Sequence, residues 1–117
     1  MGGRGTLAVE KGLEAGLDAI RRGEYFAAHE VLEDAWRAAA PEERDFFQGL
    51  VHVAVAWYQA GRGNRVGCER QLDKASRRLG PFAPEHRGVD VGSILEQVET
   101  AKEIVAVQSL ELPPPRL

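Results

Sequence analysis

Hydrophobic residues recur at intervals of three and four along most of this chain, the spacing that places them on one face of a helix. Thr6 can cap a first helix, which ends near "RRG". A second helix is predicted from about Glu24 to Ala39. The apolar stripe of the first helix consists of Leu13, Leu17 and Ile20.

Three further helices are predicted in the rest of the chain. Pro41, followed by acidic residues, favours the first turn of a third helix that continues to Ala60. Asn64 can cap a fourth, and the segment "SILE", Ser93–Glu96, has the spacing of a capping box before a fifth. Because the links are short, neighbouring helices should pack antiparallel. The sequence therefore predicts an all-α protein, a single bundle of about five mostly antiparallel helices.

The same pattern suggests one domain with two less regular ends. A chain of 117 residues is large enough for one modest core. We expect a flexible N-terminus at 1–6, a helical domain at 7–109 and a loose, proline-rich tail at 110–117.

The third helix should be the centre of the bundle, because two apolar stripes cover most of its circumference. The remaining narrow strip is polar or small, and consists of Asp45, Gln48, Gly49, His52, Ala56 and Gln59. A glycine in a helix interior costs up to about 1 kcal/mol relative to alanine. Gly49 therefore predicts a close approach of the second and third helices.

The stretch "YFAAHEVLEDAW" in the second helix places polar residues on the face that should meet the core. His29 lies on the same face as Leu32 and Trp36, and Glu33 borders it. In an antiparallel hairpin, residues equally far from the turn lie at one level, which pairs His29 with His52 and Glu33 with Gln48. Polar groups of the two helices should therefore face one another.

One interpretation of this cluster is a divalent metal site. His29 and Glu33 are an i, i+4 pair, His52 would be the third ligand, and Glu30 would be free to act as a base on bound water. The segment "HEVLE" lacks the second histidine of the zinc-protease helix. The di-iron pattern also fails, since no glutamate lies three residues before either histidine.

Two other interpretations stay open. In the one we prefer, the cluster is a hydrogen-bond network that fixes the packing: His29 bonds Glu33 or His52, and Arg37 neutralises Glu30 or Glu33. In the other, it lines a pocket for a small polar ligand. The preferred function is a binding or interaction domain, and the alternative is a metal-dependent hydrolase that uses His29 and Glu33.

Net charge, cysteine content and the absence of a recognisable signal or membrane span limit the partners and the cellular location expected for this protein. The net charge is −3, which gives no overall attraction to nucleic acid or to an anionic membrane. No signal peptide or membrane span is recognisable, so a cytoplasmic protein is expected. The single cysteine, Cys68, occupies a core position and excludes an internal disulfide. His86 is expected at the surface, and Asp90 should set the turn into the last helix.

The fourth helix carries a basic side, made of Arg70, Lys74, Arg77 and Arg78. No aromatic residue interleaves it, so nucleic-acid binding is the weakest of the functional hypotheses. We expect a solvated face or a partner for the acidic segment at 24–45. That attraction is consistent with contacts inside the bundle and with a homodimer.

The segments "GEYFAAHEVLEDAWR", "RDFFQGLVHVAVAWYQAGRGN" and "GVDVGSIL" resemble a helical domain family of unknown function, number 309. The resemblance covers roughly Leu13 to Val105. It rests on Gly23, Phe26, His29, Glu30, Glu33, Trp36, Arg37, Gln48, Gly49 and Asn64. It implies a compact all-α protein, with a metal-dependent hydrolase activity ascribed to some members. His52 departs from the residue expected after "QGL", so it is a local feature of this chain.

Overall fold

The computed structural model describes residues 3–117, and the regular structure of that range is helical. No strand occurs within it, only an isolated bridge between His86 and Val89. The helices are α1 (Gly3–Arg21), α2 (Tyr25–Ala38), α3 (Arg44–Gly61), α4 (Arg65–Leu79) and α5 (Val91–Ala106), with short 3₁₀ helices η1 (Pro41–Glu43) and η2 (Gly80–Phe82). The all-α prediction is confirmed.

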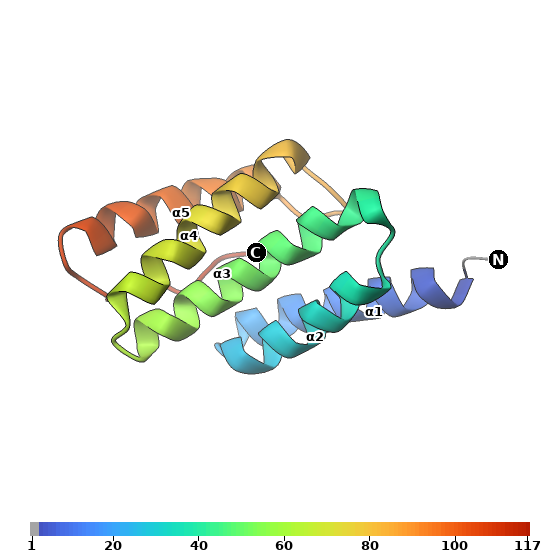
Figure 1. Ribbon diagram of the computed structural model, residues 1–117, viewed down its shortest axis with the longest axis horizontal. Coiled ribbons are helices and arrows are strands. Elements are labelled where there is room, and N and C mark those ends of the chain that lie inside the picture. The colour runs from blue at the N-terminus through green and yellow to red at the C-terminus, as the bar shows by residue number, and fades with distance from the viewer. Residues whose placement is uncertain (1–2) are drawn as a thin grey trace.

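Neighbours in sequence are neighbours in space. Figure 1 shows α3 between α2 and α4, with α1 paired to α2 and α5 paired to α4. The bundle is elongated, measuring 50 × 25 × 20 Å along its principal axes. The central place predicted for α3 is confirmed, and it follows from the near-complete burial of that helix from Phe46 to Ala60.

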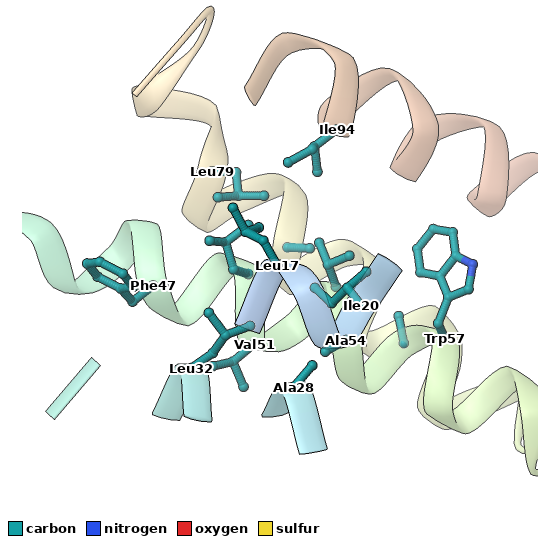
Figure 2. Close-up of a cluster of buried hydrophobic side chains, with 14 of the residues drawn as sticks. Leu17, Ile20, Ala28, Leu32, Phe47, Val51, Ala54, Trp57, Leu79 and Ile94 are labelled. Carbon is teal, nitrogen blue, oxygen red and sulfur yellow. The ribbon is translucent and has the colours of Figure 1, made fainter. Parts of the chain in front are cut away.

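The core contains buried side chains from all five α-helices. Figure 2 shows Leu17, Leu32 and Val51, from three different helices, turned toward one another. The two hairpin helices α1 and α2 approach closely, since a Cβ built on Gly16 would lie 2.4 Å from Leu32 Cγ. Only glycine leaves room for that leucine, which is fully buried.

Most helix ends fall close to the predicted positions, and two caps differ. α1 begins at Gly3, so Thr6 lies inside the helix and does not cap it; residues 1–2 of the predicted flexible end lie outside the described residues. At the start of α5, Asp90 is the cap, because its Oδ1 accepts a hydrogen bond from the Ser93 amide at 2.9 Å. The capping box predicted at Ser93 was therefore three residues late. The Asn64 cap of α4 is confirmed, with a 2.9 Å bond from the Gly67 amide.

The proline-rich tail packs on the bundle, so the prediction of a loose tail was wrong. The indole Nε1 of Trp57 donates to the Pro113 carbonyl at 2.9 Å. Arg21 donates to the Leu117 carbonyl at 3.1 Å, and Pro115 is buried. The tail thus lies against α1, α3 and α5, and covers apolar surface between them.

His86 is half-buried, contrary to the surface position predicted for it. Its Nε2 lies 2.9 and 3.0 Å from the two carboxylate oxygens of Glu43, and its ring packs edge-on against Phe46 and Phe82. Arg87 donates to the same carboxylate. This contact joins the loop before α5 to η1.

Candidate functional site

A groove of about 390 Å³ runs between α2, α3 and α4, and we call it the central groove. It is lined by His29, Glu33, Trp36, Gln48, Val51, His52, Val55 and Gln71. The structure thus brings together the polar groups that the hairpin geometry had paired across α2 and α3. Three apolar side chains and two amides complete a lining typical of ligand sites, which combine apolar walls with a few placed polar groups.

His29, Glu33 and Arg37 form a chain of contacts along α2 at the edge of the groove. His29 Nε2 lies 2.6 Å from Glu33 Oε2, and Arg37 donates to Glu33 Oε1 at 2.9 Å. The side chains of His29 and Glu33 are 30% and 33% exposed. They lie at the rim of the bundle and not in its core, which explains why a charge is tolerated on that face of α2.

His52 is the most buried polar residue of the site, at 9% exposure. Its Nδ1 lies 2.7 Å from Oε1 of Gln71 on α4. A carbonyl oxygen can only accept, so Nδ1 carries the proton and Nε2 is left as a bare acceptor. Nε2 is buried and has no hydrogen-bond partner.

Electrostatics keeps this imidazole neutral. Burial lowers the pKa of His52 below its usual value, and the nearby charges of Lys74, Arg78 and Arg77 lower it further. The hydrogen bond with Gln71 acts in the opposite direction and does not outweigh them. At neutral pH the groove wall therefore contains an uncharged ring whose free nitrogen can accept a proton or a hydrogen bond.

The three residues considered as metal ligands, His29, Glu33 and His52, do not gather into one group. Among residues 3–117 there is no group of three or more histidine, cysteine, aspartate or glutamate side chains placed to hold a metal ion. His29 and Glu33 contact each other, while His52 is bonded to α4.

The polar strip of α3 faces α4 more than α2, which corrects the explanation given for Gly49. A Cβ built on Gly49 would lie 2.5 Å from Leu79 Cγ and 3.3 Å from Arg78 Cβ, both on α4. Asp45, one turn earlier on α3, accepts a bond from Arg78 at 2.9 Å. The close approach at Gly49 is real, but the partner is α4.

A second groove, of about 330 Å³, adjoins the first, and we call it the basic groove. It is lined by Asp45, Gln48, His52, Lys74, Arg77 and Arg78. Gln48 and His52 line both grooves. The sequence analysis assigned the cations of α4 to a face separate from the site. Their spacing could have placed them beside it, because Lys74 and Arg78 follow Gln71 by one and two turns and so lie on the same face of the helix.

An aromatic cluster borders the other end of the central groove, and it was not predicted. Phe26 is 52% exposed, and its ring centroid lies 5.7 Å from that of His29 and 5.6 Å from that of Tyr58. A hollow of about 160 Å³ beside it shares His29 and Val55 with the central groove. Apolar surface thus lies at one end of the site and basic surface at the other.

The remaining predicted residues lie around these grooves. Trp36 lines the central groove and is half-buried. Glu30 is exposed and lines none of the three hollows described. Asn64 caps α4 and donates to Gln59 Oε1 at 3.1 Å, which gives it a structural role.

No helix within residues 3–117 has the length and apolar character that a membrane crossing requires. No solved structure matches the chain. Two curated proteins are similar to it, and both are described as uncharacterised. YpuF of Bacillus subtilis (strain 168) is 33% identical over 100 residues, covering 77% of this chain and 56% of YpuF. A protein of Aquifex aeolicus (strain VF5) is 30% identical over 90 residues, covering 74% of this chain and 27% of that protein.

The chain thus spans about half of the length of YpuF and about a quarter of the Aquifex protein. A family model also matches residues 13–71, the range from α1 to the middle of α4. Every residue that lines the central groove, from His29 to Gln71, falls inside that range. The chain belongs to the family described as Domain of unknown function (DUF309).

Proposed function

We propose that this protein is a binding domain that takes a small polar ligand in the central groove. The volume of about 390 Å³ suits a ligand of fragment to metabolite size. Trp36, Val51 and Val55 offer apolar walls, while the two glutamine amides and the two imidazoles offer polar contacts. A role confined to packing would not require an open groove at the meeting point of three helices.

The observation that carries this proposal is the unpaired Nε2 of His52. A buried acceptor without a partner costs roughly 1–3 kcal/mol, and native proteins leave few of them. Gln71 holds the other ring nitrogen, which fixes the tautomer that leaves this acceptor free. A ligand with an N–H or O–H group would satisfy it. Because Nε2 is covered, binding must include the rotation of a neighbouring side chain in the groove wall.

The test uses neutral, planar hydrogen-bond donors, namely benzamide, adenine and uracil, titrated into ¹⁵N-labelled protein. At least one should shift the side-chain amide signals of Gln48 and Gln71 and the Nε2 signal of His52. Molecules of this size are expected to bind weakly, with dissociation constants of about a millimolar. Shifts confined to other parts of the bundle, or none at all, would contradict the proposal.

A matched pair of variants checks the position of the ligand. Val55→Trp fills the groove and should abolish the shifts, whereas Glu103→Trp adds the same side chain on the exposed side of α5 and should leave them intact. Circular dichroism establishes that both variants are folded. If Val55→Trp does not fold, the location of the shifts in the unmodified protein decides the question.

A further inference from the structure

The basic groove concentrates positive charge next to the central groove. Lys74 and Arg77 are exposed and have no ion-pair partner among the described residues, while Arg78 is paired with Asp45. Three cations and one carboxylate line this groove, which leaves a net charge of about +2. Since the whole chain carries −3, this surface differs in sign from the protein around it.

A phosphate monoester matches that charge. It carries about −1.5 to −2 at neutral pH and presents three strong acceptor oxygens. Arginine and lysine are the side chains that bind phosphate best in proteins, the first through two parallel N–H groups. A carboxylate would neutralise only half of the excess charge.

The two grooves share Gln48 and His52 in their lining, which places them next to each other. Resting on the proposed function, we propose that the ligand is a phosphomonoester of a planar, hydrogen-bond-donating group, of which a mononucleotide is the simplest example. The phosphate binds Lys74 and Arg77, and the planar group lies in the central groove against Trp36. A donor on the planar group satisfies Nε2 of His52.

The buried acceptor, Nε2 of His52, determines which kind of group can lie next to the phosphate. Lys74, Arg77 and Arg78 place positive charge near a ring that is held neutral, so an N–H or O–H donor fits there and a second cation does not. A neutral donor next to a dianion is the combination found in a nucleoside monophosphate. Inorganic phosphate alone would fill only the basic groove.

The experiment compares AMP, adenosine and inorganic phosphate by the same NMR titration at low ionic strength. AMP should bind at least about tenfold more tightly than adenosine, and should shift both Trp36 and the α4 signals. Inorganic phosphate should shift the α4 signals alone. The advantage of AMP should shrink as salt is added, because exposed charges are screened.

Variants of α4 distinguish specific phosphate binding in the basic groove from a general attraction of anions to the basic side of this helix. Lys74→Gln combined with Arg77→Gln should remove the preference for AMP, while Arg70→Gln, on the same helix and outside the groove lining, should keep it. If adenosine occupies the central groove as tightly as AMP, the phosphate assignment is wrong and the binding domain stands. If neither molecule shifts the groove, and the three neutral probes do not either, both proposals fail. The assignment would also be wrong if Arg70→Gln reduced the preference for AMP over adenosine as much as the double variant does.

Discussion

Gln97 on α5 holds Arg116 in the tail by two hydrogen bonds to its backbone. The Gln97 Nε2 donates to the Arg116 carbonyl at 2.6 Å, and the Arg116 amide donates to Gln97 Oε1 at 2.6 Å. This is the pairing that a neighbouring strand would make, supplied here by one side chain. The tail is therefore fixed by a specific contact as well as by the burial of Pro115.

Replacing Gln97 with alanine should release the end of the tail. The two hydrogen bonds lost to Arg116 should cost about 1–3 kcal/mol in the free energy of unfolding, measured by urea denaturation. The sharper readout is hydrogen exchange, in which the Arg116 amide should be protected in the unmodified protein and exchange freely in the variant. Glu103→Ala, also on α5, should change neither quantity. Protection that survives in Gln97→Ala would show that this side chain does not hold the tail.

The packing of the tail on the bundle could not be predicted from the composition of the tail. Three consecutive prolines favour an extended backbone, but that preference does not say what the segment packs against. What the sequence does not reveal is that Trp57 and Gln97, from separate helices, carry donors and acceptors aligned with that extended chain. Long-range pairing of this kind leaves no periodic signal.

The central groove was more accessible to sequence reasoning. Helix periodicity and a short link were sufficient to bring His29 and Glu33 near Gln48 and His52, because equal distances from a turn fix the level on both arms. The sequence does not show whether the polar strip of α3 faces α2 or α4. A helix that lies between two others can present a polar strip to either of them, and the hydrophobic pattern alone does not say which.

Gly49 provides a test of the contact between α3 and α4. Gly49→Ala would gain helix propensity of up to about 1 kcal/mol but would drive a methyl group into Leu79, which is fully buried. We expect a net loss of about 1–2 kcal/mol in the free energy of unfolding. Gly61→Ala is the control, since a Cβ there meets nothing within 4 Å and should not destabilise.

Leu79→Ala combined with Gly49→Ala should cost less than the sum of the two single changes, because the smaller side chain makes room for the new methyl group. Strict additivity in this double-mutant cycle would mean that the two positions do not touch. Urea denaturation at one temperature gives all four free energies.

Glu43 should make stability depend on pH at the acid end. Burial alone would raise the pKa of Glu43, but hydrogen bonds from Arg87 and His86 and their charges outweigh it and lower the pKa below its ordinary value of 4.5. A carboxyl group with a lowered folded-state pKa stabilises the protein above the unfolded pKa. That stability is lost as the pH falls through the folded value. The loss should therefore occur below about pH 4.5.

Glu43→Gln isolates this effect from that of the other carboxylates. At neutral pH the variant should be less stable by about 1.5–3 kcal/mol, the range for hydrogen bonds to a charged group. The difference from the unmodified protein should narrow as the pH falls below 4.5, as followed by thermal melts in a buffer series. A difference that stays constant down to pH 3 would place the stabilising contact elsewhere.

Cys68 should be inert in the folded protein. The side chain is fully buried, and burial, with a smaller effect of the Glu69 charge, raises the pKa of its thiol to about 11. The thiolate is the reactive form, so almost none is present at pH 8. Alkylation by iodoacetamide should be slow in buffer and fast in urea. Equal rates in the two solvents would show that the core opens around α4.

The contacts of Glu33 should contribute little to stability, which separates a packing role from a binding role. Both partners of Glu33 lie within its own helix, and both contacts are partly exposed i, i+4 pairs, so each is worth about 0.3–0.5 kcal/mol. Glu33→Gln should thus lower the free energy of unfolding by less than about 1 kcal/mol. Leu32→Ala, the next residue on α2 and fully buried, should lower it by about 2–5 kcal/mol. A loss for Glu33→Gln as large as that for Leu32→Ala would mean that the cluster serves to hold the helices together. Contacts made within one helix at the rim of the bundle cannot supply that much free energy by themselves. A loss of that size would therefore require that the packing of α3 against α2 depends on Glu33.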